Sequence, residues 1–578
     1  RQHEMYRSPD RLTHPMKRSG DAWLRVGWDR ANAEIGEKVR GIVERHGPDA
    51  VAMYVGTAAG FSVLHPVFAQ GFMNGLGSTS MYASATQDCA NKFAAAREIY
   101  GFPFTQPFPD VDHTQCLVIV GANPVVSKWS FLQVADPTKR LREIAERGGR
   151  VVVVDPRRTE TARAATDHLF IRPDTDVFFY LSFLHEVLAT GGVDAERVAA
   201  HMTGFDDVAA LVEAWSPERT EAVTAIPAAK LRDLVATYLE ADGAALYSST
   251  GVNMGTNGVL AFWLQEVINA VSGNLDRRGG TLVGQGVMDF ARFGVRTGTL
   301  MADDRSRIGG FRKVNDAYPG GILADEILTP GDRQVRALFV TGGNPLITMP
   351  NAGRLRDALS TLELLVTVDI YRNETGSLAH YPLPATDPFQ RADLPFIFPL
   401  MLGLQSRPYL QATEPVVEPD GEQRDEATIY LELAKACGVG LFGSKVAQRS
   451  LEMATRRHTR KRRVDHPGAQ PRVPQEALLT WLFHLTRQPG LAKLLASPHG
   501  FARPERREAT FLGERVVTEA GKVHLAPPRL VERADRLADD SGAAQADRAA
   551  GTLKLITKRR TKTHNSWTHN HPGMVNGP

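Results

Sequence analysis

Hydrophobic and polar positions along the first two thirds of the chain predict layered α/β structure. Between about residues 49 and 386, short β-branched runs are followed by Gly, Asn or Pro turns and then by segments with apolar residues three or four positions apart. This alternation is typical of parallel sheets covered by helices. The predicted strands are Val51–Val55, Leu117–Val120, Val151–Val154, Ala245–Tyr247, Leu338–Val340 and Leu364–Val368, and the predicted helices include Leu260–Val271 and Ile429–Ala436.

Composition narrows the class of protein without changing this picture. With 578 residues, 43% of them hydrophobic and 23% charged, the chain has enough apolar material for several large cores. A small binding module and wholesale disorder are therefore excluded. The longest apolar run, residues 394–404, is interrupted by two prolines and is far shorter than the roughly 20 residues that a membrane span needs. We predict no membrane span in this chain.

One run of basic residues stands out against the nearly balanced net charge of +3. It contains Arg456, Arg457 and the four residues 460–463. No aromatic residues interleave with these charges, as stacking on bases would require. A solvated loop or helix face is therefore the favoured interpretation, and no nucleic-acid partner is predicted. Further on, residues 533–550 are rich in Ala, Asp and Arg and are predicted to form a linker, and a strand is predicted to begin near Lys554.

Cysteine is scarce in this sequence. It occurs only at Cys89, Cys116 and Cys437, with no CxxC pair. This chain cannot supply four thiolates to an iron–sulfur cluster or to a zinc site. The first residues also lack the charged start and apolar core of a signal peptide. We predict a cytoplasmic protein.

The most informative feature is an internal repeat. LVIVGANP at 117–124 and LFVTGGNP at 338–345 are two predicted strands that end in the same Gly-x-Asn-Pro turn. Each is followed by a second strand that ends in Asp. The separation is 32 residues from Asn123 to Asp155 and 25 from Asn344 to Asp369, enough for one crossover helix. Five and six residues after each Asp stand Glu and Thr, at 160–161 and 374–375.

The ends of these strands favour two nucleotide-like sites. In open α/β sheets, ligands bind beyond the carboxyl ends of strands, where Gly lets the backbone approach a phosphate and an acid on the next strand accepts hydrogen bonds from a ribose or purine. A tight turn and a helix-capping Asp would explain either half alone. The repeated register of the Asp and the Glu-Thr pair favours the ligand-binding interpretation. No GxGxxG turn follows either strand, which disfavours an ordinary NAD site.

Nearly the whole chain resembles the molybdopterin oxidoreductases of the dimethyl sulfoxide reductase family. The motifs that carry the resemblance are YRSPDRLTHPMKR at 6–18, VGANP, VVVVDPRRTETA at 151–162, RPDTD at 172–176, STGVNMGTNG at 249–258, SGNLDRRGG at 272–280, TGGNP, VDIYRNET at 368–375 and RRTKTHNSWTHN at 559–570. Members of that family hold molybdenum or tungsten between two molybdopterin guanine dinucleotides. The resemblance implies a bis-molybdopterin guanine dinucleotide enzyme that carries out two-electron or oxygen-atom transfer on a small substrate.

Carried over position by position, the resemblance assigns cofactor contacts to both halves. One dinucleotide and its pterin would be lined by Gly121, Asn123, Asp155, Arg157, Asp174, Asp176, Gly251 and Asn253. The other would be served by Gly342, Asn344, Asp369, Glu374 and Thr375, and a closing segment would contribute Arg560, Asn565, Ser566 and His569. Asp suits the donor edge of guanine, and Arg together with backbone amides suits pyrophosphate.

The family's metal ligand comes from a side chain upstream of the VGANP strand, here within YASATQDCANKF. Cys89 is the first candidate because a soft thiolate suits molybdenum, and Asp88 is the second because a carboxylate serves in some branches. Cys89 could equally be a small buried core residue. Ala90 follows it where formate-oxidising branches tend to have His, which disfavours formate as the substrate.

The resemblance also implies a domain plan of two related Rossmann-like α/β domains and a C-terminal β-barrel domain. We predict a remnant of an N-terminal iron–sulfur domain at 1–30, a discontinuous α/β domain at 31–88 and 286–450, a dinucleotide-binding α/β domain at 89–285, and a linker with a truncated barrel at 451–578. Family members carry a [4Fe–4S] cluster just before the point where this sequence begins. The cluster and an electron-transfer partner protein are therefore expected outside this segment.

Two other functions compete with this one. The first is a non-catalytic scaffold or electron-transfer subunit of the same fold that has lost its cofactor, although such a protein has no physical need for the paired Asp and Glu-Thr sets. The second is a nicotinamide dehydrogenase with unorthodox turns, which would bind NAD.

Overall fold

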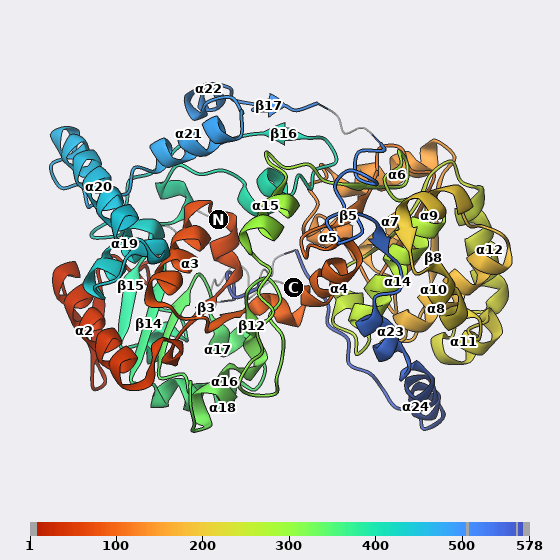
Figure 1. The fold of residues 1–578 in the computed structure, drawn as a ribbon, viewed down its shortest axis with the longest axis horizontal. Helices are drawn as coiled ribbons and strands as arrows, with labels where there is room; N and C mark the ends of the chain where they lie inside the picture. Colours follow the sequence, from red (N-terminus) through yellow and green to blue (C-terminus); the bar gives the residue numbers. More distant parts are fainter. Residues whose placement is uncertain (1–7, 505–507, 562–564, 570–578) are drawn as a thin grey trace.

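Two parallel sheets lie in separate halves of an elongated molecule (Figure 1). The computed structural model describes residues 8–504, 508–561 and 565–569. One sheet has the strand order β12-β4-β3-β13-β14-β15 and the other the order β10-β6-β7-β8, with parallel pairing throughout. The strands of the first are β3 (Val51–Val55), β4 (Met81–Ala83), β12 (Tyr318–Pro319), β13 (Ala337–Thr341), β14 (Leu364–Asp369) and β15 (Tyr381–Pro384). Those of the second are β6 (Cys116–Val120), β7 (Arg150–Val154), β8 (Asp167–Leu169) and β10 (Ala244–Ser248).

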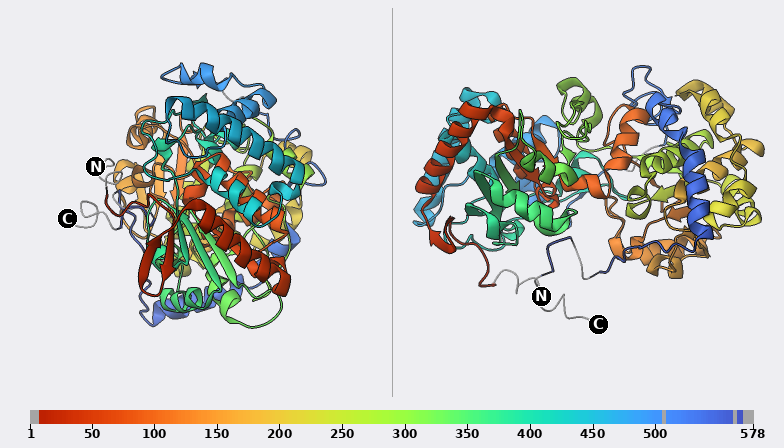
Figure 2. Two further views of the ribbon diagram at one scale, coloured as in Figure 1. Left: turned by 90° about the vertical axis from the view of Figure 1, so that its left-hand side faces the viewer. Right: turned by 90° about the horizontal axis from the view of Figure 1, so that it is seen from below.

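Helices cover both faces of each sheet because the strands are apolar on both sides, as parallel strands usually are. On the six-stranded sheet, α2 (Trp28–His46), α3 (Leu64–Leu76) and α19 (Glu426–Ala436) pack on one face, and α16 (Leu323–Leu328) and α18 (Ala352–Thr361) pack on the other. On the four-stranded sheet, α8 (Asp176–Ala189), α12 (Ala228–Glu240) and α14 (Gly258–Val271) face α6 (Pro137–Glu146) and α7 (Glu160–Ala164) across the strands. Figure 2 shows α2 lying across the six-stranded sheet. Each half is a three-layer unit.

The predicted α/β class with parallel sheets is confirmed. All six predicted strands are present, and the two predicted helices are parts of α14 and α19. The crossover helix of each repeat is also present, as α6 between β6 and β7 and as α18 between β13 and β14. The proposed domain boundaries stay predictions.

The remaining elements are short strands and helices around these two units. The strands are β1 (Met16–Ser19), β2 (Ala22–Arg25), β5 (Pro107–Pro109), β9 (Met202–Thr203), β11 (Thr281–Val283), β16 (Tyr409–Leu410), β17 (Phe501–Ala502) and β18 (Val523–His524). The helices are α4 (Ala90–Tyr100), α5 (Pro124–Ser127), α9 (Ala195–His201), α10 (Phe205–Val212), α11 (Pro217–Thr224), α13 (Thr250–Asn253), α15 (Phe290–Thr297), α17 (Pro345–Thr348), α20 (Lys445–Asp465), α21 (Gln475–Leu485), α22 (Leu491–Leu495), α23 (Pro528–Ala534) and α24 (Leu537–Ala549).

The predicted partial barrel at 451–578 is wrong for the residues of this range that the structure describes. They form α21–α24 and the end of α20, and their only strands, β17 and β18, have two residues each. The predicted linker at 533–550 is mostly α24, because its Ala-rich sequence favours a helix and Leu537 packs into the core. The strand predicted near Lys554 is also absent, since no neighbouring strand pairs with this segment and Leu555 is 98% exposed.

The basic run lies on α20, where Arg456, Arg457, Arg460 and Lys461 are exposed. This agrees with the favoured interpretation as a solvated helix face. Within the described ranges, no helix is both long enough and apolar enough to cross a bilayer. A cytoplasmic location stays a prediction.

Glu266 of α14 is a buried acid in the core of the four-stranded unit. It is 1% exposed and accepts hydrogen bonds from the Tyr100 hydroxyl at 2.7 Å and from the Gln265 amide at 2.9 Å. Burial raises the pKa of Glu266 to about 7. The folded state therefore binds this proton more tightly than the unfolded state does, and this group lowers stability as pH rises from about 4.5 to about 7.

We expect Glu266→Gln to reduce the loss of stability between pH 5 and pH 8 by up to about 3 kcal/mol, because one pKa unit corresponds to about 1.4 kcal/mol. Urea unfolding of both proteins at the two pH values measures this difference. A variant whose free energy of unfolding keeps the parent's pH dependence would contradict the assignment.

Candidate functional site

The two Gly-x-Asn-Pro turns have the same backbone shape and the same side-chain contacts. The φ and ψ angles are −130° and 68° at Asn123 and −132° and 70° at Asn344. In both halves the Asn carboxamide oxygen accepts hydrogen bonds from the backbone N–H of the repeated Thr at 3.2 Å and from its hydroxyl at 2.7 Å. The Asn amide donates to Glu160 at 2.9 Å in one half and to Glu374 at 2.6 Å in the other. The sequence repeat is therefore a repeat of three-dimensional contacts.

These contacts explain why Glu and Thr recur at the same offsets in both halves, because the turn itself binds them. The Thr375 hydroxyl also accepts a hydrogen bond from the backbone N–H of Leu346 at 3.2 Å, so the Asn-Thr pair fastens the turn to the loop after the next strand. Turn chemistry alone is thus enough to fix the Glu-Thr pair, contrary to the argument from register. The side chains of Asn123 and Asn344 hold the backbone in place, and any ligand contact at these turns falls mainly to backbone groups.

We expect Asn344→Ala to lower the free energy of unfolding by about 1–3 kcal/mol, because it leaves the buried Thr375 without its acceptor. Thr375→Ser keeps the hydroxyl and is the matched control, which should cost less. Chemical denaturation compares the two variants. Equal losses would show that the hydrogen bonds to Asn344 contribute nothing measurable.

A third strand completes each copy of the repeat. Matching the two halves of the sequence to each other did not reveal it. β10 pairs with β6 as β3 pairs with β13. The turns after β10 and β3 contact the glycine turns, because Gly251 N–H donates to the Gly121 carbonyl at 2.9 Å and Ala58 N–H donates to the Gly342 carbonyl at 3.3 Å. These contacts lie where the strand order reverses, which is where open α/β sheets bind ligands.

Gly121 and Gly342 are required by this geometry. Their φ angles are +55° and +58°, and a Cβ atom would lie 2.8 Å from the Val252 nitrogen or 3.0 Å from the Ala59 nitrogen. We call the place where the strand order of each sheet reverses its switch point. At each switch point two backbone segments meet with no room for a side chain between them.

The strand-end acids are half-buried at the same edges of the sheets. Asp155 accepts a hydrogen bond from Arg157 N–H at 2.8 Å, and Asp369 accepts one from Tyr371 N–H at 3.1 Å. Burial raises the pKa of Asp155, that of Asp369 to about 6, and that of Asp176, at the start of α8, to about 7. In the part of the chain that the structure describes, none of these three carboxyls forms an ion pair.

Asp174 differs from the other predicted acids because protein groups already bind it. Its carboxylate accepts hydrogen bonds from the backbone N–H and the hydroxyl of Thr256 at 2.7 and 2.8 Å and pairs with Lys554 at 3.5 Å. Its φ of +66° is strained for a residue with a side chain. Asp174 thus fastens the RPDTD loop to the loop that follows α13.

Asn253, at the end of α13, has an unused acceptor. Its amide donates to the Ser249 carbonyl at 3.1 Å, but its carboxamide oxygen is buried and lacks a hydrogen-bond partner among the described residues. The Ser248 hydroxyl beside it is in the same state. Buried polar groups are normally satisfied, so this end of β10 has spare hydrogen-bonding capacity for a bound group.

The stretch that contains the predicted metal ligand connects the two units. It begins at β4 of the six-stranded sheet, passes through the 3₁₀ turn Ser84–Gln87, and reaches Cys89 immediately before α4, which packs on α14 of the other unit. The Asn91 amide donates to the Asn253 carbonyl at 2.6 Å. Cys89 therefore lies at the start of a helix that contacts one predicted pterin site, on a segment that comes from the other unit.

The Cys89 thiol is buried, and burial together with the neighbouring Asp88 raises its pKa well above the ordinary value. The buried cation Lys92 lies close enough to lower the pKa of Cys89, but burial outweighs it, so this group is a thiol and not a thiolate. Among the described residues no three His, Cys, Asp or Glu side chains gather into a metal site. A metal bound here would need most of its ligands from a non-protein group, and Cys89 and Asp88 both stay predictions.

The last described residues run past both candidate sites. Lys554 reaches Asp174, Arg559 donates to the Ser130 hydroxyl at 3.2 Å, and the His569 ring bonds Glu374 at 2.9 Å. The Trp567 ring packs edge-on against Phe61, in the turn after β3, with ring centres 5.8 Å apart. The structure thus brings His569 to the second turn. The predicted residues Arg560, Asn565 and Ser566 lie in the same segment.

A buried polar network beneath the second turn was not predicted. The His65 ring bonds the Thr341 hydroxyl at 2.6 Å and lies 3.4 Å from Glu426, which pairs with Arg391 at 2.5 Å. Burial lowers the pKa of His65 to about 4, so the ring is neutral. The corresponding end of β6 is the apolar Val120, so the two turns differ in their electrostatic surroundings. The members of this network are single residues far apart in the chain, so no motif in the sequence indicates that they meet.

These observations fit a pair of bound dinucleotides. Backbones approach closely at two switch points, and three half-buried acids form no ion pair with the described residues. Among the same residues, Asn253 and Ser248 have polar atoms without a hydrogen-bond partner. Guanine presents N–H donors that a carboxylate can accept, and backbone amides at helix starts suit phosphates. The fold is that of an α/β protein with two parallel sheets and a duplicated switch point.

A family model described as molybdopterin oxidoreductase matches residues 11–436, and the chain belongs to this family. The resemblance inferred from the motifs is therefore confirmed. The members of the family are enzymes, and their cofactor is a molybdenum or tungsten pterin.

Curated relatives are similar to most of the chain. The probable oxidoreductase YyaE of Bacillus subtilis (strain 168) is 26% identical over 449 residues, covering 77% of this chain and 63% of the relative. The assimilatory nitrate reductase catalytic subunit of the same organism is 24% identical over 532 residues, covering 88% and 71%. Among solved structures, acetylene hydratase from Pelobacter acetylenicus has a TM-score of 0.73 at 20% identity and covers 98% of this chain and 78% of its own, which shows a common fold. The chain thus spans less than two thirds of YyaE.

Proposed function

We propose that this chain is the catalytic part of an oxidoreductase that uses a bis-molybdopterin guanine dinucleotide for two-electron or oxygen-atom transfer on a small substrate. The observation that carries the proposal is the duplicated switch point. Gly121 meets Gly251 in one unit as Gly342 meets Ala58 in the other, and beside each lies a half-buried strand-end acid that forms no ion pair with the described residues. A single-nucleotide enzyme would need only one such edge.

Each unit would hold one dinucleotide with a defined set of groups. In the four-stranded unit, Asp155 and Asp176 would be the acceptors for guanine. Arg157 uses Nη2 for Glu160 at 3.5 Å and would turn its remaining N–H groups to phosphate. The backbone at Gly121 and Gly251, with the Asn253 carboxamide, would approach the pterin. In the six-stranded unit, Asp369 takes the place of Asp155, and Asn344, Glu374 and Thr375 hold the turn.

When bound, the pterin-held metal supplies the redox chemistry by changing its oxidation state by two electrons. The protein orients the cofactor and excludes water around it, and Cys89, or else Asp88, gives the metal its protein ligand. The last segment is held against both units by two contacts, one between His569 and Glu374 and one between Lys554 and Asp174. The electron-transfer partner and the [4Fe–4S] cluster belong to this proposal and lie outside the chain described here.

The test uses the intact protein purified from its native cells. Metal analysis by mass spectrometry, GMP released by acid and pterin fluorescence should give molybdenum or tungsten together with about two GMP per metal. A well-folded preparation without metal or GMP would reject the proposal and favour the cofactor-free scaffold. Tight binding of NAD to that preparation would favour a nicotinamide dehydrogenase.

A further inference from the structure

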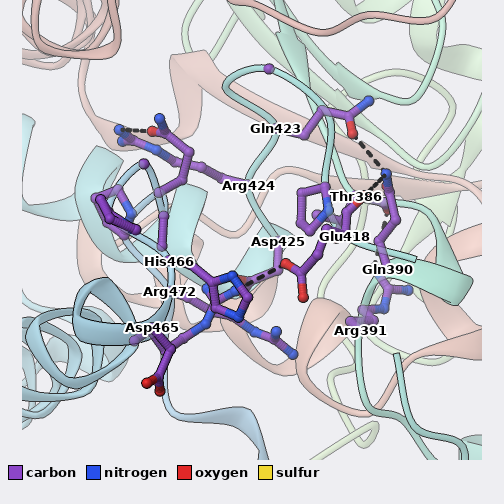
Figure 3. A pocket seen from close by; sticks show the side chains of 18 residues that line it. Thr386, Gln390, Arg391, Glu418, Gln423, Arg424, Asp425, Asp465, His466 and Arg472 are labelled. Atoms are coloured by element: carbon purple, nitrogen blue, oxygen red, sulfur yellow. Dashed lines mark hydrogen bonds and ion pairs between the residues drawn. The ribbon is translucent and has the colours of Figure 1, made fainter. Parts of the chain in front are cut away.

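A cavity of about 310 Å³ lies between the six-stranded unit and α20, and its lining includes none of the residues assigned to the cofactor. The wall comes from the loop after β15, the turn before α19, and the end of α20 with the loop that follows it (Figure 3). Residues 445–472 lie beyond the stretch that the family model matches. Membership of the family therefore does not account for this cavity.

Four arginines line the cavity, and two of them are neutralised from behind. Arg391 pairs with Asp393 at 3.1 Å and with Glu426, and Arg424 pairs with Glu432, all three of them acids that are not part of the lining. These two guanidinium groups form a rigid, buried wall.

Arg462 and Arg472 have spare donors. Arg462 uses Nη2 for Glu418 at 3.3 Å, and Arg472 uses Nη2 for Gln475 at 2.8 Å and Glu476 at 3.3 Å. Neither guanidinium makes another hydrogen bond or ion pair with the described residues. Burial, and after it the charge of Arg472, lowers the pKa of Arg462, while nearby acids raise it; the two arginines line one cavity and repel each other. An anion between them would relieve this repulsion and accept from their free N–H groups.

The acids near the two arginines occupy few of their donors: Glu418 pairs with Nη2 of Arg462 and Glu476 with Nη2 of Arg472, and Asp425 attracts both without bonding either. Both carboxylate oxygens of Asp425 are bound by Thr428, at 3.0 Å from its N–H and 2.7 Å from its hydroxyl, as the cap of α19. Glu418 is 64% exposed, and the carboxylate of Asp465 points away from Gln390 and Arg391 (Figure 3).

We propose that this cavity binds a phosphate group between Arg462 and Arg472, either as inorganic phosphate or as the phosphate of a small monoester. Guanidinium groups match the geometry of phosphate oxygens and are suited to binding them in partly buried sites. One water molecule accounts for about 30 Å³ of liquid volume, so 310 Å³ leaves room for an organic part beside the phosphate.

The test measures thermal unfolding of the full chain at millimolar inorganic phosphate, glycerol phosphate and chloride of matched ionic strength. A ligand that binds the folded state alone raises Tm in a saturable way. We expect both phosphates to raise Tm above the chloride value, and Arg462→Gln and Arg472→Gln to weaken binding at least tenfold by calorimetry. Arg456→Gln is the control, because it removes an arginine of the same helix that is 73% exposed and not part of the lining. A larger response to glycerol phosphate identifies the monoester as the ligand, and equal responses identify inorganic phosphate.

The proposal is overturned if neither phosphate raises Tm beyond chloride, or if Arg462→Gln binds phosphate as the parent does. Should Arg472→Gln fail to fold, Arg462→Gln still decides, since Arg462 pairs only with the exposed Glu418. The measurement does not require the cofactor, so its result is independent of the proposed redox function.

Discussion

Replacing Cys89 with alanine is expected to lower activity by more than about 100-fold, while the metal stays bound through the pterins with one protein ligand fewer. Even indirect partners of a metal site typically cost 10–100-fold, and a protein ligand should cost more. Burial keeps the pKa of this thiol well above its usual range despite the nearby Lys92, so a directly bound metal ion would be needed to hold it as a thiolate. Metal content per chain, measured together with released GMP and with activity, shows whether activity is lost while the metal stays bound.

Two matched variants make the result specific. Cys437→Ala removes another buried thiol, in the core against the six-stranded sheet, and should leave activity and metal content unchanged. Asp88→Ala tests the second candidate. If Asp88→Ala loses activity while Cys89→Ala keeps it, the carboxylate is the ligand and Cys89 is the small core residue that its burial also allows.

The strands of the two sheets could be predicted because parallel strands buried on both faces are continuous β-branched runs. Val151–Val154 and Leu364–Val368 are examples, and both are present. The short strand β4 and the two-residue β12 have no such signal. The placement of β4 beside β3, and of β12 beside β4, depends on contacts made by distant parts of the chain.

The repeat was recognised from two strands, whereas the structure has three in each copy. GANP and GGNP share letters because Asn and Thr side chains make the same hydrogen bonds in both halves. The third turns, STGVN after β10 and GTAAG after β3, contribute backbone groups, which any small residue can supply. Backbone contacts leave little trace in a sequence, so this half of the switch point was visible only in the structure.

The C-terminal region was predicted least well, and the reason is physical. The resemblance implied a barrel, but the stretch from residue 528 to 549 has Ala-rich helical sequence, and Leu530 and Leu537 pack into the core of the four-stranded unit. The last motif was predicted to contribute His569 to the second site, and His569 does contact Glu374 at that turn. Between Leu537 and His569 the course of the chain depends on tertiary packing, which the sequence pattern does not reveal.

Replacing Gly121 or Gly342 with alanine is expected to disrupt one switch point each. The positive φ costs alanine about 1–2 kcal/mol, and the added Cβ would push the backbone at Val252 or Ala59 out of place. We expect each variant to be destabilised by more than the conformational cost alone and to lose roughly half of the GMP released by acid, because only one of the two sites is damaged. Gly298→Ala separates the two causes, since Gly298 has φ +74° but no atom within 4 Å of the Cβ position. Its stability should fall by the conformational cost alone, with GMP unchanged. If Gly121→Ala and Gly342→Ala retain the parent's GMP content, the two switch points do not hold the dinucleotides, and the duplicated fold must serve another purpose.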